Sequence, residues 1–492
     1  MVKRARDPGK ILVVGSGVGG LTAGILLTKL GYSVTIVEKN AVPGGLLRGY
    51  RRSGIDCPVG IHYLGSLAPG EPLRRLWDCL GVTEHVPLER MGLDGPIDRY
   101  VFDDFVFDLP EGLAAFEDSL RQSFPAEQRQ IAAFIEEMRP VFESFARLDM
   151  LTTRGIQGSL DNFSPMGEYV ARLNCSLRLV SVLAVPTTLI GIPFHDCPRF
   201  YYYMILASYL LSSWRLVEST TVMTDRFIQQ FQSLGGELLV GDAVDCVTVS
   251  AGAIKGLRLK SGRCLPADTV IAAIHPRNVL SMLPPKSLRS EHEARITGLE
   301  NTKGLLVVTL AVDDRYHAER PYNLYRLYPE ADGSLSRGSF HQIRRSNQPE
   351  TLLLTIMTTS GIDEWAPWLD TRTGQRGEEY EEAKWKRAGT LLADATDLFG
   401  SLQGMRVIDI YTPLTIRDWV GSPGGSAYGI MRSSAQLLKT ACLSRPSLAG
   451  LYFAGQNILA PGILGTTLGS FQVVRRIIGH KRFTREIMEE CC

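Results

Sequence analysis

Hydrophobic and polar positions follow two different periods within the first forty residues. Four apolar residues, Ile11 to Val14, form a short run typical of a strand that is buried on both faces of a parallel sheet. From Leu21 to Leu30 the apolar positions recur at helical spacing, and Gly31 is a natural helix end. A second apolar run, from Ser33 to Val37, ends in the acidic Glu38. The pattern predicts a strand, a helix and a second strand of an α/β domain.

The loop between the first strand and the helix is rich in glycine. Gly15 permits a tight turn, Gly17 lets the backbone approach a pyrophosphate, and Gly20 lets the helix pack on the strand. The start of the helix offers free N–H groups to phosphates. A carboxylate 18 residues after Gly20 can accept hydrogen bonds from a ribose. We therefore predict a Rossmann-type dinucleotide site that contains Gly15, Gly17, Val18, Gly19, Gly20, Glu38 and Lys39.

Beyond this motif the pattern changes character several times. Residues 70–217 look mostly helical, and the uncharged run from Phe200 to Trp214 is either a buried helix, the lining of an apolar channel or a surface that enters a membrane interface. After residue 221 the pattern returns to α/β. The further expected elements are helices at 222–234 and near 377–392, strands at 237–240, 243–247, 253–260, 267–273, 304–312, 351–358 and 451–454, and a last helix that starts near Gly465.

These changes predict two interleaved domains. A Rossmann-type α/β domain for the dinucleotide would be assembled from three separate parts of the chain, and an α+β substrate-binding domain from the two parts between them. The expected dinucleotide-binding parts are 1–69, 218–289 and 411–492 with the C-terminal helix, and the expected substrate-binding parts are 70–217 and 290–410.

Charge and cysteine usage narrow the classes of function. The chain has 53 Lys and Arg against 52 Asp and Glu, and this balance argues against nucleic acid as a partner. The nine cysteines show neither a zinc-binding nor a disulfide framework, so we expect a reducing cytoplasm and no metal. No stretch is long enough to span a membrane. The basic start of the chain (Lys3, Arg4, Arg6, Lys10) is either a solvated arm or a contact with anionic lipid.

Several further motifs carry a family resemblance. The pair Gly44-Gly45 after the second strand resembles the FAD-dependent amine oxidase and desaturase superfamily. Three more segments together resemble retinol saturases, within the wider carotenoid desaturase and isomerase group. These are Gly60 to Gly65 (GIHYLG), Thr412 to Gly429 with its TPLT, GSP and YG motifs, and Tyr452 to Ile458 (YFAGQNI) followed by Gly462 and Gly465.

The resemblance implies FAD as the cofactor and an amine-oxidase-like fold. It also implies a flavin-dependent enzyme that reduces one double bond of a conjugated, lipophilic polyene by hydride transfer. Helix N–H groups at the start of the last helix would stabilise the negative charge of reduced flavin. Beyond the first motif, the cofactor-binding residues that it implies are Gly44, Gly45, Leu46, Gly60, Ile61, His62, Val244, Gly455, Gln456, Gly465, Thr466 and Thr467.

Reduction of a double bond also requires a proton, and an apolar substrate requires an apolar wall. We predict that His62, Tyr63 or Tyr428 supplies or relays the proton, although a histidine between glycines is equally often structural. Burial of a polyene of about 400 Å² would contribute about 10 kcal/mol before association costs. The predicted substrate-facing residues are Tyr201, Tyr202, Trp214 and Trp419.

Departures from the family pattern keep other functions open. Cys57-Pro58 replaces the family's Phe-Asp, and Glu218-Ser219 replaces a glycine pair. We also expect no secretory leader of the kind that the vertebrate enzyme has. The alternatives are a carotenoid desaturase or isomerase, a reductive cyclase of a polyene such as a macrolactam, and a non-enzymatic FAD-containing isoprenoid escort protein. The electron donor is either NAD(P)H or a separate reductase, because no second dinucleotide motif is visible. Peripheral membrane contact is expected, and the oligomeric state is open.

Overall fold

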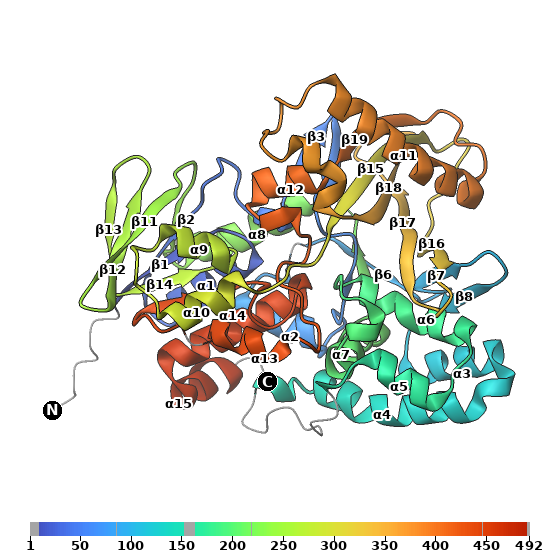
Figure 1. Ribbon diagram of the computed structural model, residues 1–492, viewed down its shortest axis with the longest axis horizontal. Coiled ribbons are helices and arrows are strands. Elements are labelled where there is room, and N and C mark those ends of the chain that lie inside the picture. The colour runs from blue at the N-terminus through green and yellow to red at the C-terminus, as the bar shows by residue number, and fades with distance from the viewer. Residues whose placement is uncertain (1–8, 85, 152–162, 218, 445, 490–492) are drawn as a thin grey trace.

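A five-stranded parallel sheet carries the glycine-rich loop (Figure 1). Its central strand β1 (Lys10–Val14) pairs with β2 (Ser33–Val37) on one side and with β14 (Thr269–Ala272) on the other. The outer strands are β10 (Glu237–Leu239) and β20 (Leu451–Phe453). Four of the five residues of β1 are buried, as expected for a strand covered on both faces. The sheet therefore joins three parts of the chain that lie far apart in the sequence.

Helices pack around this sheet and contribute to its core. α1 (Val18–Lys29) contacts α8 (Thr220–Ser233) and α14 (Gly462–Ile478), and α14 also contacts α2 (Pro72–Leu80). The sequence placed α2 in the substrate-binding part, but Trp77 and its apolar neighbours belong to the same core as the parallel sheet. This helix has a strongly one-sided apolar face, and that face packs against α1 and α14.

The α+β part of the structure contains a seven-stranded sheet, in the order β19-β15-β18-β17-β16-β7-β8. All of its pairs are antiparallel except β16 with β7. The long helix α11 (Glu378–Phe399) packs on the sheet. Its strands are β7 (Asp98–Val101), β8 (Val106–Leu109), β15 (Gly304–Asp313), β16 (Asn323–Pro329), β17 (Leu335–Arg345), β18 (Thr351–Ser360) and β19 (Arg406–Tyr411).

The segment 70–217 is less helical than its sequence suggests. It contributes β7 and β8 to the large sheet. In a separate three-stranded sheet, β9 (Ser213–Leu216) pairs with the short β5 (Leu64–Gly65) on one side and with β6 (Leu88–Met91) on the other. These strands are too short to show an apolar period, and apart from the β7–β8 pair their partners lie far away in the sequence. The helices of this layer are α3 (Leu113–Ser123), α4 (Gln128–Ala146), α5 (Met166–Leu173), α6 (Leu177–Thr188) and α7 (Arg199–Leu211).

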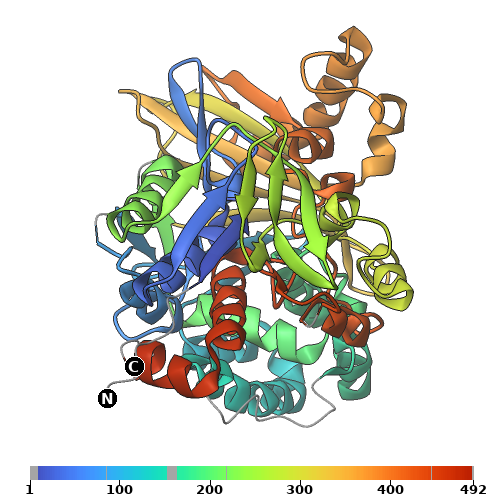
Figure 2. The same cartoon turned by 90° about the vertical axis from the view of Figure 1, so that its left-hand side faces the viewer.

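Smaller elements complete the structure. Figure 2 shows another three-stranded sheet beside the strands of the central sheet. Its third strand was not predicted. These elements are β11 (Val244–Ser250), β12 (Ala253–Leu259), β13 (Cys264–Pro266), the hairpin β3 (Gly49–Arg52) with β4 (Ile55–Pro58), and the helices α9 (Pro276–Met282), α10 (Ser290–Thr297), α12 (Pro413–Val420), α13 (Leu437–Thr440) and α15 (His480–Phe483).

This computed structural model describes residues 9–84, 86–151, 163–217, 219–444 and 446–489. Lys3, Arg4, Arg6 and Glu218 lie outside these ranges, whereas Lys10 is the first residue of β1. Within them, no helix combines the length and the apolar character needed to cross a membrane. Six cysteines in these ranges are free thiols, whereas Cys79 is disulfide-bonded, which the cysteine spacing did not predict.

Candidate active site

A cavity of about 400 Å³ joins the glycine-rich loop to the helical layer. Its wall includes Gly17 and Glu38 from the parallel sheet, Phe340 from the large sheet, and Tyr201 and Met204 from α7. The predicted site residues that line it are Gly15, Gly17, Val18, Gly19, Glu38, Gly45, Leu46, Gly60, Ile61, His62, Tyr63, Tyr201, Trp419, Tyr428, Gly455, Gln456, Gly465 and Thr466. The cavity therefore brings together most of the residues that the sequence proposed for a cofactor and a substrate.

The glycine-rich loop has the space that a diphosphate requires. Gly17 caps α1 without a side-chain hydrogen bond, and no described atom lies within 4 Å of the position that a Cβ would take there. At Gly20 a Cβ would lie 2.0 Å from the carbonyl oxygen of Gly15, so this glycine is needed for the close approach of helix and loop. The first N–H groups of α1 face the cavity without a capping side chain, which suits a phosphate.

Glu38 is held ready to accept further hydrogen bonds. The Oε2 atom of its buried carboxylate accepts from the backbone N–H (3.0 Å) and the hydroxyl (2.7 Å) of Ser16, and Oε1 accepts from the N–H of Asn40 at 2.9 Å. A carboxylate offers about four acceptor positions, so these three bonds leave capacity for a ribose hydroxyl. The residues present thus fit an adenine dinucleotide.

The last helix begins three residues earlier than predicted. α14 starts at Gly462, so the N–H groups without a partner in the helix are those of Gly462, Ile463 and Leu464, which all line the cavity. Gly465 lies one turn inside, where a Cβ would come within 2.6 Å of the carbonyl oxygen of Ala460. The preceding Gly-Ile-Leu reads equally well as loop, and for this reason the sequence misplaced the helix start.

Five of the implied cofactor residues lie beside the cavity and do not line it. Gly20 packs against Gly15, the backbone N–H of Gly44 donates to the hydroxyl of Ser16 at 3.0 Å, and Thr467 is buried in α14. Lys39 donates to the backbone oxygen of Asp418 at 3.2 Å, and Val244 is the first residue of β11. Thr467 is buried, and its hydroxyl has no hydrogen-bond partner in the described part of the chain.

Helix α7 turns one face to the cavity and the other to the core. The cavity-facing residues recur at helical spacing, whereas Tyr202 and Tyr203 are fully buried against Phe134. Tyr202 therefore lies outside the cavity wall, and so does Trp214, which belongs to β9 and donates its indole N–H to the hydroxyl of Ser212. The cavity-facing residues are Tyr201, Met204, Ile205, Ser208 and Tyr209.

Trp419 lies half-exposed at the end of α12 and also lines the cavity. The guanidinium of Arg48 lies 5.2 Å from the centre of its ring, a distance typical of a cation–π contact. The side chain of Asn40 donates to the backbone oxygen of Trp419 at 3.0 Å. These contacts join α12 to the loops that follow β2.

The three residues predicted to handle a proton differ in their surroundings. Within the described residues neither ring nitrogen of His62 has a hydrogen-bond partner, and burial with the nearby Arg344 lowers its pKa to about 3. Burial raises the pKa of Tyr428 to about 12. Tyr63 alone belongs to a hydrogen-bonded group: its hydroxyl lies 3.1 Å from Asp98 and 3.0 Å from the hydroxyl of Tyr325. His62 is therefore neutral near pH 7.

Sequence reasoning missed Asp98, Tyr325 and Tyr209 in this part of the site. Tyr325 and Tyr209 line the cavity, and Asp98 lies behind Tyr63. Asp98 and Tyr325 come from neighbouring strands of the large sheet whose paired residues, such as Asp98 and Asn323, are 225 apart in the sequence. No local motif signals that they meet.

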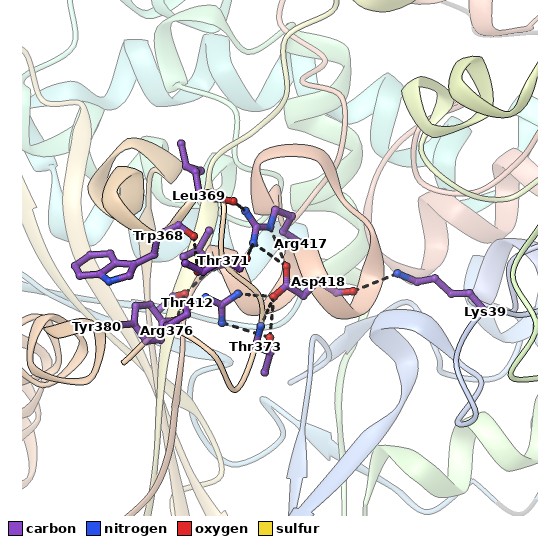
Figure 3. A network of polar contacts seen from close by, with 11 residues as sticks. Lys39, Trp368, Leu369, Thr371, Thr373, Arg376, Tyr380, Thr412, Arg417 and Asp418 are labelled. Carbon is purple, nitrogen blue, oxygen red and sulfur yellow. Dashed lines mark hydrogen bonds and ion pairs between the residues drawn. The ribbon is translucent and has the colours of Figure 1, made fainter. Parts of the chain in front are cut away.

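A polar network outside the cavity holds the segment that carries Trp419 (Figure 3). The carboxylate of Asp418 pairs with Arg376 and Arg417 and accepts from the N–H (2.8 Å) and hydroxyl (2.9 Å) of Thr373. Arg417 also donates to the backbone oxygen of Thr371 at 2.6 Å. Asp418 thus joins the loop before α11 to α12, next to the mouth of the cavity.

Removal of the charge of Asp418 should loosen this loop. In Asp418→Asn the guanidinium of Arg376, only 4% exposed, keeps its position but loses its carboxylate, and we expect a loss of about 3 kcal/mol in the free energy of unfolding. Urea unfolding measures this loss. Asp245→Asn is the control, because its pair with Arg258 is exposed and should contribute less than about 1 kcal/mol. Equal losses in both variants would contradict a structural role of the network.

The comparisons with known proteins agree with this geometry. The family model of the NAD(P)-binding Rossmann-like domain matches residues 13–80. The chain is 23% identical to the all-trans-retinol 13,14-reductase of Danio rerio, over 93% of this chain and 84% of the relative. It is 24% identical to the 4,4'-diapolycopene oxygenase of a Methylomonas species, over 96% and 98%.

The resemblance to this group of enzymes is confirmed. Among solved structures, the cyclohexylamine oxidase of Brevibacterium oxydans superposes with a TM-score of 0.62 at 16% identity, over 96% of this chain and all of that one. The predicted fold class, a Rossmann-type domain interleaved with an α+β unit in the amine-oxidase manner, is also confirmed, as is the prediction of an oxidoreductase.

Proposed function

We propose that this protein binds FAD and uses it to reduce one double bond of a conjugated, lipophilic polyene. The observation that carries the proposal is the continuity of the cavity: the same space is lined by the dinucleotide loop and by the apolar face of α7. A bound flavin would supply the hydride equivalent for the reduction.

The chain's own residues would bind and orient both partners. The N–H groups at the start of α1 would hold the diphosphate, and Glu38 would accept from the adenosine ribose. The N–H groups of Gly462, Ile463 and Leu464 would stabilise negative charge on the ring system of the reduced flavin. Tyr201, Met204 and their neighbours on α7 would exclude water from the substrate.

An anaerobic experiment tests this function. The purified protein is reduced with NADPH or, if NADPH fails, with a separate reductase or dithionite, and a panel of polyenes is then added. We expect reoxidation of the flavin and a product heavier by two hydrogens. A product lighter by two hydrogens, formed when the polyene is added to the oxidised enzyme in a parallel sample, would indicate a desaturase. An isomeric or cyclised product would indicate an isomerase or reductive cyclase. Binding without any redox change would indicate an escort protein, and absence of flavin would overturn the proposal.

A lipophilic substrate also motivates a proposal for the site of action. We propose that the protein works in the cytoplasm at the periphery of a membrane, from which it takes its substrate. Co-sedimentation with liposomes of neutral and anionic composition tests this contact, and a protein that stays in the supernatant with both compositions would rule it out.

A further inference from the structure

A buried polar group lies behind the cavity, between the loop after β4 and the large sheet. The hydroxyl of Tyr63 donates to Oδ2 of Asp98 at 3.1 Å, and the side-chain amide of Asn323 donates to Oδ1 at 2.8 Å. The amide of Gln342 in turn donates to Asn323 Oδ1 (2.9 Å) and to the backbone oxygen of His62 (3.1 Å). Asp98, Asn323 and Gln342 are each at most 2% exposed. The carboxyl group thus has only neutral hydrogen-bonding partners, and when Oδ2 carries a proton the bond to Tyr63 runs from the carboxyl group to the tyrosine oxygen.

No cation offsets a charge on this carboxyl group. Within the described ranges, no Arg, Lys or His side chain hydrogen-bonds or ion-pairs with Asp98. The titratable groups that face it are tyrosines, and burial raises the pKa of every one, so all are neutral near pH 7. A buried carboxylate without a cation is costly, so this group tends to hold its proton. The facing tyrosines are Tyr63, Tyr100, Tyr209 and Tyr325.

Burial raises the pKa of Asp98 to about 7, although the hydrogen bonds from Asn323 and Tyr63 oppose the shift. The group therefore exchanges its proton in the range where enzymes work, which is the property of an effective proton donor. Asp98 does not itself line the cavity, whereas Tyr63 and Tyr325 do. Its proton can reach the cavity through the hydroxyl of Tyr63, which contacts both Asp98 and Tyr325.

We propose that Asp98 is the proton reservoir for the reduction and that Tyr63 delivers the proton to the substrate. This inference rests on the proposed function. A bound reduced flavin would supply the hydride equivalent, two electrons and a proton, to one alkene carbon and would itself be oxidised. The neighbouring carbon takes the hydroxyl proton of Tyr63, and Asp98 returns a proton to the tyrosine oxygen. The carboxylate then regains a proton from solvent, so the double bond gains two hydrogens in all.

The pH profile of the substrate half-reaction tests this assignment. Reduced enzyme is mixed with a polyene, and flavin reoxidation is followed between pH 5 and pH 9. In the wild type we expect the rate to fall about tenfold per pH unit above about pH 7, as Asp98 loses its proton. Asp98→Asn keeps the size of the side chain; its oxygen can still accept from Asn323, and its NH2 group can donate to the hydroxyl of Tyr63. Its rate should be about 100-fold lower and independent of pH over this range. Asp98→Glu should restore part of the pH dependence.

Two further variants separate delivery from structure. Tyr63→Phe should lose a similar factor while the flavin is still reduced at the wild-type rate. Asp108→Asn is the matched control, because this carboxylate lies on the neighbouring strand β8 in a half-exposed pair with Arg99. It should keep the wild-type profile. An unchanged profile in folded Asp98→Asn would overturn the proposal.

An infrared measurement supplies a readout without turnover. The protonated carboxyl of Asp98 should give a carboxylic-acid C=O band that titrates near pH 7 in the wild type and is missing in Asp98→Asn. If the enzyme reduced a polyene but lacked this band, the role of Asp98 as proton reservoir would be overturned and the proposed function would stand. The band without reduction of any polyene would overturn the proposed function, and with it the delivery step, while still establishing a protonated Asp98.

Discussion

Replacement of Gly17 by glutamate should abolish retention of the flavin while the chain stays folded. The backbone at Gly17 has φ −66° and ψ 176°, which any residue adopts, and no described atom lies within 4 Å of the new Cβ. An acidic side chain at a helix start is not itself unfavourable. It would, however, fill the diphosphate space and repel the phosphates. We expect FAD to bind at least about 100-fold more weakly, a change of about 2.8 kcal/mol.

Gly20→Ala is the matched control for this experiment. Its Cβ would lie 2.0 Å from a backbone oxygen that cannot move independently, so this smaller substitution should destabilise the chain itself by about 3 kcal/mol or more. Fluorescence titration with FAD and thermal unfolding of the apoprotein measure the two effects separately. If Gly17→Glu bound FAD as tightly as the wild type does, the assignment of the glycine-rich loop as the diphosphate site would be wrong.

The sequence predicted the dinucleotide motif well because its elements are local. β1, α1 and β2 follow one another within 28 residues, from Lys10 to Val37, and each shows its own apolar period. α7 was harder to interpret, because apolar residues that face a cavity and apolar residues that face a core look alike. In the structure the two kinds of residue differ only in whether they face the cavity or the core. Tyr202 and Trp214 do not line the cavity.

Features that depend on distant pairing could not be predicted. Asp98 meets Asn323 only because β7 and β16 are neighbours in a parallel pair. The same holds for Asp418, whose partner Arg376 comes from a different loop. A carboxylate in the sequence gives no sign of its partners, and partners decide whether it is a charged structural group or a protonated acid.

Acid should destabilise this protein steeply below about pH 6.5. Burial lowers the pKa of His62 to about 3, of His275 to about 4 and of His341 to about 3. These folded-state values lie below the ordinary 6.5, so unfolding takes up protons once the pH falls below 6.5, and stability is lost. Between pH 7 and pH 5 each histidine lowers the free energy of unfolding by about 2 kcal/mol. Asp98, whose folded-state pKa is raised, increases it by about 2 kcal/mol over the same range.

The net loss between pH 7 and pH 5 is therefore about 4 kcal/mol, a large part of the 5–15 kcal/mol that stabilises a typical domain. Urea unfolding at several pH values measures it. His341→Gln should remove about 2 kcal/mol of the pH dependence, because this ring is fully buried and its Nδ1 has no partner in the described chain. Stability that is flat from pH 7 to pH 5 would show that these rings are protonated in the folded protein.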